Sequence, residues 1–582
     1  MPNDPSVEYN KPSDLTCDLL VIGSGAGGLS TAVTAAAKGL DVIVAEKEPE
    51  IGGTTAYSGG WLWIPHAPQV IKDGITEDGE APKRYLRSIV GNRYNEKLIN
   101  RYLETAPEML DFFERKTAVS FNPGSAVPDF HGHLKDAAKG GRSVVAAPYD
   151  GRELGSLINK LAKPIPETTL LGMGIAAGAD MRAFLTVFRS FPAFRYVTKR
   201  LLRHIADICR YGRSMQIVNG NALVARLLKS CDIHHVRLLT EYAAQSLIKN
   251  NQSVEGAIFH HNGQLKTIKA RYGVVLATGG FPHDPLRQAA LFPHVAHGTP
   301  HHSAAPLSNT GEGLNIAEQA GGIVDRTQFS AGAWAPVSLV PRKDGTVGRF
   351  PHLVERGKPG IISVRENGKR FVHEDGPYYD FIAALIEATP HNEPVKAWLI
   401  ADHHFVRRYG LGAVKPFPVP LTKWVRNGYL KRANSLNELA KLCGIDAIGL
   451  EQTVSRYNED AVRGEDNEFH RGSTAYQRAQ GDPDHKPNPC IAPLCKAPFY
   501  AVEIVPGSLG TFAGLICDED GRVLDAHEEA IQGLFAAGND MNSIFGGTYP
   551  SGGITLGPAM TFGYIIGKNA AEQHQKNSFR GD

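Results

Sequence analysis

The 582-residue sequence has no apolar run approaching the roughly 18 residues that a membrane-spanning helix needs. Residues 1–16 are polar, contain three prolines and lack the apolar core of a signal peptide. We therefore expect a cytoplasmic protein.

Cysteine is scarce and unpatterned: seven residues, no CxxC pair, and the nearest two, Cys490 and Cys495, five positions apart. This favours buried thiols in a reducing compartment over a disulfide framework. The adjacent pairs His234-His235 and His301-His302 have poor chelate geometry, so no metal site is predicted. The formal net charge of only +2 gives no reason to expect nucleic acid as a partner.

What is present is an ordinary globular composition. Hydrophobic residues make up 42% and charged residues 21%, which is enough apolar material for a large core. The length predicts two or more domains, and there are no internal repeats.

Glycines at the GxGxxG spacing follow an apolar run at residues 18–22. The run is typical of a buried parallel strand. Gly23 permits the tight turn, Gly25 lets the backbone approach a pyrophosphate, and Gly28 lets the next helix pack closely. The start of that helix offers unpaired N–H groups to phosphate.

A second apolar strand at residues 41–45 ends at Glu46. A carboxylate about 20 residues after the glycines suits ribose hydroxyls. It would repel a 2′-phosphate, so NADP is disfavoured. A bare GxGxxG is a weak signal, but strand, glycines, helix, strand and Glu46 in order predict a dinucleotide site.

Three further segments indicate whether the dinucleotide is FAD or NAD. Residues 51–60 (IGGTTAYSGG) resemble the stretch that runs under the flavin in FAD-dependent fumarate reductase and succinate dehydrogenase relatives. Residues 272–280 and 531–540 resemble that family's second glycine crossing and its C-terminal segment, whose acidic residue binds the ribityl chain. Residues 552–558 open a last helix, whose N–H groups would face flavin N1 and O2.

The resemblance implies FAD. Some relatives attach the flavin to a histidine, but this chain has Thr54 and Thr55 there, so non-covalent FAD is expected. The residues predicted to bind it are Gly23, Ser24, Gly25, Ala26, Gly27, Gly28, Glu46, Lys47, Gly53, Thr54, Thr55, Ser58, Gly59, Gly60, Ala277, Thr278, Gly279, Gly538, Asn539, Asp540, Thr555 and Leu556.

Flavin segments return only near the C-terminus, so the FAD-binding domain is discontinuous. The predicted fold is α/β: a Rossmann-like FAD-binding domain with an inserted α+β substrate domain that caps it. The expected segments are 1–330 and 506–582 for the FAD-binding domain and 331–505 for the insertion.

The segment expected to bind substrate distinguishes between groups of relatives. Dicarboxylate enzymes place an arginine where this chain has residues 546–553 (GGTYPSGG), and Arg356 is one residue out of register for their acid-base arginine. The chain is instead similar over nearly its whole length to the 3-ketosteroid Δ1-dehydrogenases. The likeness includes residues 61–65, 149–155, 359–362, 367–374 and Tyr378 and, most specifically, residues 549–564.

In that family a tyrosine hydroxyl and a glycine N–H hold the C3 carbonyl oxygen, and they map to Tyr549 and Gly553. A second tyrosine that removes the C2 proton maps to Tyr378. The neighbouring Tyr379 is an alternative that only spacing disfavours. The Tyr549-x-Ser551 pattern also resembles the 4-ene (5α) steroid dehydrogenases, in which a serine assists a different proton abstraction.

The chain departs from the family at one position. A third tyrosine usually supports the base, but residues 128–133 read PDFHGH, so Phe130 or a histidine stands there. His131 or His133 is a candidate replacement as a proton relay, and an exposed loop histidine is the plainer interpretation.

Basic and apolar residues interleave over residues 188–213. This pattern fits a basic amphipathic helix on a membrane surface, a solvated helix or a dimer contact.

We expect an FAD-dependent oxidoreductase that introduces a C=C bond α,β to a cyclic ketone, first of all on ring A of a 3-ketosteroid. Its partners are then a small hydrophobic ketone and an electron acceptor that the sequence does not name. Alternatives are a 4-ene (5α) steroid or cyclohexanone-type dehydrogenase, an enone reductase running in reverse, and a protein that holds flavin without redox chemistry.

Overall fold

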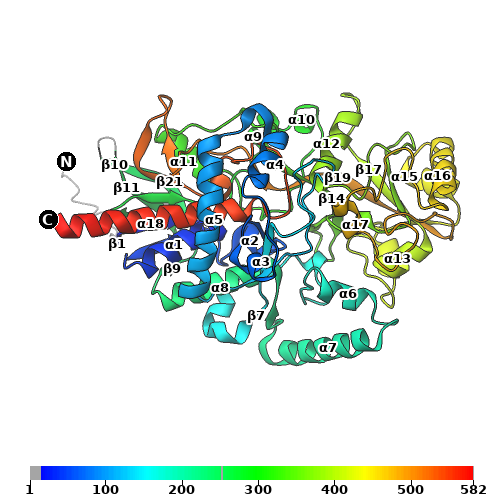
Figure 1. Cartoon of the computed structure of the whole chain (residues 1–582), viewed down its shortest axis with the longest axis horizontal. Helices are drawn as coiled ribbons and strands as arrows, with labels where there is room; N and C mark the ends of the chain where they lie inside the picture. Colours follow the sequence, from blue (N-terminus) through cyan, green and yellow to red (C-terminus); the bar gives the residue numbers. More distant parts are fainter. Residues whose placement is uncertain (1–14, 251–252, 581–582) are drawn as a thin grey trace, which may run out of the picture.

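The computed structural model describes residues 15–250 and 253–580, so residues 1–14 of the polar N-terminal segment lie outside it. Two sheets organise the chain: a parallel sheet toward one end of the molecule and an antiparallel sheet toward the other (Figure 1). This mixed α/β architecture confirms the predicted fold class.

The parallel strands lie in the order β21, β13, β2, β3, β9. Every residue of β2 and β3 is buried, as expected for strands covered on both faces. Their bounds are β21 (Ala530–Ala536), β13 (Val274–Leu276), β2 (Leu19–Ile22), β3 (Val42–Ala45) and β9 (Arg237–Leu239).

An antiparallel ribbon continues the sheet beyond β21. It consists of β10 (Ala243–Asn250), β11 (Ser253–His261) and β12 (Gln264–Ala270). The short strand β1 (Leu15–Cys17) pairs with β12, and β20 (Arg522–Leu524) pairs with β21.

Three helices pack together on this sheet. Helix α1 (Ala26–Ala37) begins directly after the glycine turn and contacts both α8 (Asn219–Ile233) and α18 (Leu556–Arg580). A Cβ on Gly563 of α18 would lie 2.6 Å from the Gly27 carbonyl oxygen, so this glycine permits the close approach of α1 and α18.

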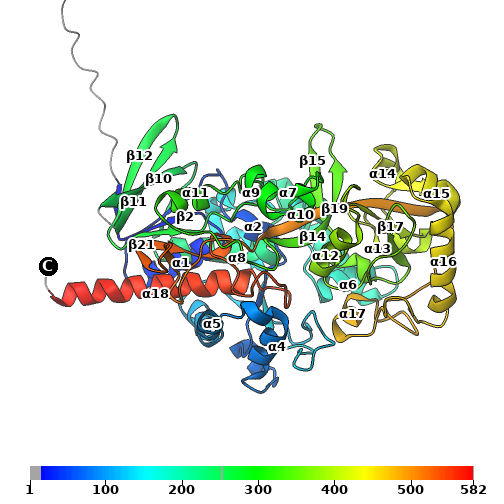
Figure 2. The ribbon, with the colours of Figure 1, turned by 90° about the horizontal axis from the view of Figure 1, so that it is seen from above.

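The second sheet is antiparallel. Strands β14 and β19 form its middle and run across the centre of the molecule (Figure 2). The bounds are β15 (Val347–Pro351), β14 (Gly332–Pro341), β19 (Phe499–Thr511), β17 (Ala397–Ala401), β16 (Ile361–Val364) and β18 (Lys431–Ala433). The proposed boundary after residue 330 precedes β14, and the one after residue 505 falls within β19.

Two helices bring tyrosines from the second unit to its border with the first. Helix α12 (Tyr378–Ala388) packs on β14, and the short α17 (Ala475–Gln480) packs on the turn Glu355–Gly357. Helices α15 (Leu436–Cys443) and α16 (Ala447–Ala461) close a separate small core at the far end.

A small sheet of β4 (Trp61–Trp63), β6 (Ser143–Ala146) and β5 (Phe121–Pro123) lies on the other side of that border. The Trp63 N–H donates to the Gly553 carbonyl oxygen at 3.1 Å, which ties this sheet to the segment before α18. Helix α3 (Pro68–Lys72) contacts β5 and α8 contacts β6, and the Tyr102 hydroxyl of α5 (Glu96–Lys116) donates to the Trp63 carbonyl oxygen of β4. Helix α4 (Ala81–Val90) precedes α5 in the chain.

Residues 188–213 contain helix α7 (Phe191–Tyr211), which buries polar as well as apolar residues. Beside Ala193 and Val197, its inward face holds Arg200, which pairs with Asp180 at 2.6 Å, and Asp207, which pairs with Arg152 at 2.7 Å. Its outward face mixes basic residues with apolar ones, of which Phe191 is 77%, Leu202 63% and Ile205 58% exposed. Figure 1 shows α7 at the margin of the molecule.

None of the helices within residues 15–250 and 253–580 combines the length and the hydropathy that crossing a bilayer requires.

Candidate active site

One cavity of about 1340 Å³ extends from the parallel sheet to the border with the second unit. The segments that follow β2, β3, β13 and β21 all line it, so it lies at the carboxyl ends of parallel strands, where open α/β sheets bind their ligands.

The glycine turn has the steric demands that its spacing predicts. Gly23 has φ +104°, and a Cβ there would lie 2.2 Å from the Ala277 carbonyl oxygen. A Cβ on Gly28 would lie 2.1 Å from the Gly23 carbonyl oxygen. No side chain caps α1, and its first residues, Ala26 and Gly27, line the cavity, as a phosphate site at a helix start requires.

Glu46 lines the cavity where β3 ends. Its carboxylate accepts hydrogen bonds from the Ser24 N–H at 3.0 Å and from the Ser24 hydroxyl at 2.5 Å. Ser24 also accepts from the Gly52 N–H at 3.0 Å. These hydrogen bonds fix Glu46 beside the glycine turn.

Of the predicted cofactor residues, only Ser24, Gly28 and Asp540 do not line the cavity. Ser24 holds Glu46, and Gly28 packs on the turn. Asp540 differs from the expectation that it would meet the ribityl chain: its buried carboxylate accepts from the Thr278 hydroxyl at 2.8 Å and the Gly280 N–H at 2.8 Å. It therefore joins the ends of β13 and β21, and its neighbour Asn539 faces the cavity.

The threonines at the position of the family's covalent histidine are both hydrogen-bonded. Thr55 accepts from the Ala26 N–H at 2.9 Å, and Thr54 accepts from the Asn309 amide at 3.0 Å. Asn309 also lines the cavity and escaped the sequence analysis, as did Glu312, which pairs with Lys47 at 2.7 Å. The lining therefore combines a series of glycines, the start of α1 and the carboxylate of Glu46, and this combination fits FAD.

Two predicted catalytic tyrosines meet at the other end of the cavity. The Tyr378 hydroxyl donates to the Tyr549 hydroxyl at 2.7 Å, and both side chains are buried and line the cavity. Tyr379, the alternative, turns away: its hydroxyl lies 2.7 Å from Ser330 Oγ and 2.9 Å from the Gly547 carbonyl oxygen. Tyr378, which the spacing favours, therefore faces the cavity, whereas Tyr379 does not line it.

Phe130, a candidate with His131 and His133 for the position of the family's third tyrosine, lies beside this pair. Its ring stacks on Tyr549 with centroids 5.5 Å apart and meets Tyr378 edge-on at 5.5 Å. His131 lies behind, with Nε2 3.3 Å from the Tyr549 carbonyl oxygen, and His133 is exposed. Neither histidine lines the cavity.

Tyr476, which no motif pointed to, completes the aromatic wall. It is buried on α17, lines the cavity and lies 4.6 Å from Phe130 between ring centroids.

Gly553 lines the cavity next to Tyr549 and requires glycine. Its φ is +100°, and a Cβ would lie 2.6 Å from the Trp63 nitrogen. Among the described residues nothing accepts a hydrogen bond from its N–H. Ser551 is buried but does not line the cavity.

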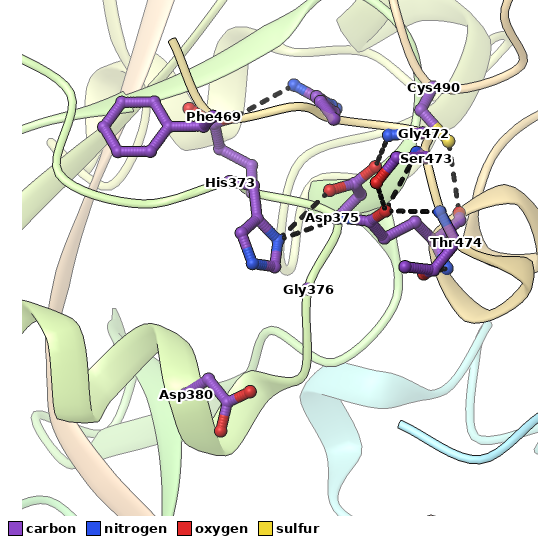
Figure 3. A network of polar contacts seen from close by, with 12 residues as sticks. His373, Asp375, Gly376, Asp380, Phe469, Gly472, Ser473, Thr474 and Cys490 are labelled. Atoms are coloured by element: carbon purple, nitrogen blue, oxygen red, sulfur yellow. Dashed lines mark hydrogen bonds and ion pairs between the residues drawn. The ribbon is translucent and has the colours of Figure 1, made fainter. Parts of the chain in front are cut away.

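A polar network sets the loop before Tyr378 against the start of α17 (Figure 3). The Gly472 N–H donates to Asp375 at 2.6 Å, and the side chain of Gln477 lies 3.2 Å from His373 Nδ1. The Cys490 thiol donates to the Gln477 carbonyl oxygen at 3.1 Å. These contacts hold Tyr378 and Tyr476 in one arrangement.

Buried charge supports the same loop. Glu374 is wholly buried and pairs with Arg370 at 2.8 Å and Arg471 at 3.2 Å, and it accepts from the Ser363 N–H at 2.8 Å. Arg356 donates to the carbonyl oxygens of His352, Glu374 and Gly376 and does not line the cavity, so it is a structural cation.

Burial dominates the electrostatics of the tyrosines. It raises the pKa of Tyr549 to about 12, although the hydrogen bond from Tyr378 opposes the shift. Burial also raises the pKa of Tyr378 well above its usual value, and the negative charge that Tyr549 would carry and the hydrogen bond to it add to the effect.

The chain resembles known flavoproteins over nearly its whole length. The model of the FAD binding domain family matches residues 18–556. A 4-oxocyclohex-2-ene-1-carboxylate 5-dehydrogenase of Sinomonas cyclohexanicum is 39% identical, with 97% of this chain and 95% of that protein covered. A 3-oxosteroid 1-dehydrogenase of Mycolicibacterium smegmatis is 33% identical, with 95% and 97% covered.

The crystal structure of 3-ketosteroid Δ1-dehydrogenase from Sterolibacterium denitrificans, in complex with 1,4-androstadiene-3,17-dione, superposes with a TM-score of 0.88. It is 33% identical and covers 96% of this chain and 100% of its own. The cofactor is therefore FAD, and the chain belongs to the FAD-binding family of flavoprotein oxidoreductases that includes the 3-oxosteroid 1-dehydrogenases.

Proposed function

We propose that the protein introduces a C=C bond α,β to the carbonyl of a cyclic ketone. FAD, when bound in the glycine-lined part of the cavity, supplies the two-electron acceptor that takes the β-hydrogen as hydride. The observation that carries the proposal is the Tyr378–Tyr549 hydrogen bond beside Gly553 in that same cavity.

Three residues act on the carbonyl oxygen and the α-carbon of the substrate. The Tyr549 hydroxyl and the Gly553 N–H bind the keto oxygen and stabilise the negative charge that develops there in the transition state. Tyr378 takes the proton from the α-carbon, and the electron pair of that C–H bond becomes part of the new C=C bond. The buried wall that includes Phe130 and Tyr476 excludes water from the ring.

The ring system has two candidates. The 33% identity to 3-oxosteroid 1-dehydrogenases supports Δ1-dehydrogenation of a 3-ketosteroid. The 39% identity to an oxocyclohexenecarboxylate dehydrogenase supports a single-ring ketone. The position of Ser551 outside the cavity lining speaks against the 4-ene (5α) alternative.

The deciding experiment mixes oxidised holoenzyme anaerobically with saturated and 4-ene 3-ketosteroids, cyclohexanones and oxocyclohexanecarboxylates while visible flavin absorbance is followed. Bleaching with formation of an enone or dienone supports the proposal. Bleaching by no ketone, together with reoxidation of chemically reduced flavin by an enone, would reverse the direction and make the protein a reductase. A flavin that neither reaction changes would contradict any redox role.

We also propose that the outward face of α7 rests on a membrane surface that contains anionic lipid. Exposed Phe191, Leu202 and Ile205 can enter the headgroup region, and Arg195 and Lys199, also exposed on α7, can meet lipid phosphate. The helix adjoins the cavity, since Arg182 and Arg189, which precede it, line the cavity.

Cosedimentation with vesicles tests this surface. We expect binding to phosphatidylglycerol/phosphatidylcholine vesicles that weakens with salt and is lost in Phe191→Ser/Ile205→Ser. Ile448→Ser, which alters an equally exposed residue on α16, is the control. Absence of wild-type binding, or a dimer that the double variant dissociates in analytical ultracentrifugation, would replace the membrane with a second copy of the chain.

A further inference from the structure

Five cationic side chains line the cavity: Lys47, Arg182, Arg189, Lys358 and Arg408. Three of them are neutralised, Lys47 by Glu312, Arg182 by Asp484 and Arg408 by Asp482. Within the described part of the chain, Arg189 and Lys358 make no ion pair. Arg189 is exposed to solvent, whereas Lys358 is partly buried.

The Lys358 ammonium group has an incomplete set of partners. It donates to the Gly481 carbonyl oxygen at 2.7 Å, and no other hydrogen bond from it is found among the described residues. An ammonium group has three donors, and burial lowers the pKa of this one. An unpaired cation in a cavity wall gains most from an anionic ligand.

A chain of contacts through α17 links Lys358 to the aromatic wall. Tyr549 stacks on Phe130, and Phe130 contacts Tyr476 at the start of α17. Tyr476 and Gln480, four residues apart on one face of α17, both line the cavity. Gly481, which holds the ammonium group, follows directly.

The keto-binding groups and Lys358 line the same cavity, so a ketone held at Tyr549 and Gly553 can direct a substituent remote from its carbonyl along this wall toward Lys358. The relative from Sinomonas cyclohexanicum is named for a single-ring ketone that carries a carboxylate opposite the carbonyl.

We infer that Lys358 binds a carboxylate opposite the keto group, so that the substrate is a single-ring keto acid. This inference rests on the proposed function for the orientation of the ring. Lys358 is a specificity residue: it contacts the end of the substrate remote from the proton transfer, so its loss should raise KM more than it lowers kcat.

A binding assay tests the inference without turnover. The holoenzyme is titrated with 4-hydroxybenzoate, a planar ring with an oxygen opposite a carboxylate, and with its methyl ester, and the flavin absorbance reports binding. We expect the wild type to prefer the acid at least tenfold. Lys358→Met should abolish the preference and leave ester affinity unchanged, and Lys358→Arg should retain it.

Two control variants show whether a lost preference for the acid comes from the missing charge or from misfolding. Arg189→Ser removes the other unpaired cation of the lining and should keep the preference for the acid. Lys358→Gln keeps a donor for the Gly481 carbonyl oxygen, so it separates loss of charge from loss of folding, and FAD content is measured for every variant. Equal binding of acid and ester by the wild type, or an unchanged preference in both Lys358→Met and Lys358→Gln, overturns the inference.

Parallel assays separate this inference from the proposed function. If 4-oxocyclohexanecarboxylate and the steroids all fail to bleach the flavin while Lys358 still selects the acid, the reaction is wrong and the anion site stands. If neutral cyclohexanone is oxidised as efficiently as the keto acid, the reaction stands and the anion site is wrong. If only a 3-ketosteroid bearing a side-chain carboxylate gains from Lys358, the single-ring substrate is wrong.

Discussion

The Tyr378 hydroxyl donates a hydrogen bond to the Tyr549 hydroxyl, 2.7 Å away, although Tyr378 begins helix α12, Tyr549 precedes α18 and the two residues lie 171 positions apart. In the proposed reaction, the ketone oxygen accepts a hydrogen bond from the Tyr549 hydroxyl while Tyr378 turns toward the α-carbon. The proposed reaction thus couples recognition of the carbonyl to removal of the proton through this pair.

The first prediction concerns Tyr378→Phe. Without the phenolic oxygen, removal of the α-proton loses its base, and flavin reduction by a ketone substrate should slow by about 10²- to 10⁴-fold. Rapid mixing under anaerobic conditions measures it, and FAD content should be normal. Near-normal reduction would exclude Tyr378 as the base.

The second prediction is a pH dependence. Burial, together with the hydrogen bond to Tyr549, raises the pKa of Tyr378, and only the deprotonated phenol accepts a proton. The rate of flavin reduction should therefore rise with pH and show no plateau below about pH 10, the ordinary tyrosine pKa. Tyr378→Phe should flatten this rise. A rate that falls between pH 7 and pH 9 in the wild type would contradict the assignment.

The third prediction concerns Gly553→Ala. At φ +100° with a Cβ 2.6 Å from the Trp63 nitrogen, alanine must displace the backbone that presents the N–H to the keto oxygen. Loss of one such donor costs about 10²- to 10³-fold in kcat. Gly39→Ala, at a positive φ with open space around it, is the control for backbone strain alone.

Sequence patterns predicted best what depends on local chain geometry. The turn at Gly23 and Gly28 and the strand ending at Glu46 follow from spacing, because the turn needs the positive φ of Gly23 and a Cβ on Gly28 would meet the Gly23 carbonyl oxygen five residues back. Tyr476 could not be found this way, since it lies in a segment without a motif and reaches the cavity only through packing of α17.

The hydrogen-bond partners of predicted site residues could not be predicted from the sequence either. The segment around Asp540 was recognised, but its carboxylate turns to Thr278 and Gly280, which only the joined ends of β13 and β21 make available. The pattern of residues 188–213 marked an amphipathic helix, yet which face is buried depends on carboxylates elsewhere, such as Asp180.

The fourth prediction concerns the buried charges around Glu374. Glu374→Gln leaves Arg370 and Arg471 short of a counter-charge at a site with no solvent exposure. Breaking a buried pair costs about 3–5 kcal/mol, so the thermal unfolding temperature should fall by several degrees. Because this network positions the loop before Tyr378, flavin reduction should slow as well.

A surface pair provides the comparison for that measurement. Arg115→Ala removes an ion pair with Asp111 in which the side chains are 74% and 44% exposed, so solvent already screens it and the melting temperature should not change. An equal shift in both variants would show that the buried network contributes no more than surface charge.

The path of β14 and β19 has a consequence for how substrate enters. Both strands belong to one hydrogen-bonded sheet, and β19 runs without a break through the proposed boundary at residue 505. A hinge there would have to bend a paired ladder, which is far stiffer than a single linker. Substrate exchange should therefore rely on small movements of surface segments at the cavity mouth, and the two units should open very little with respect to each other.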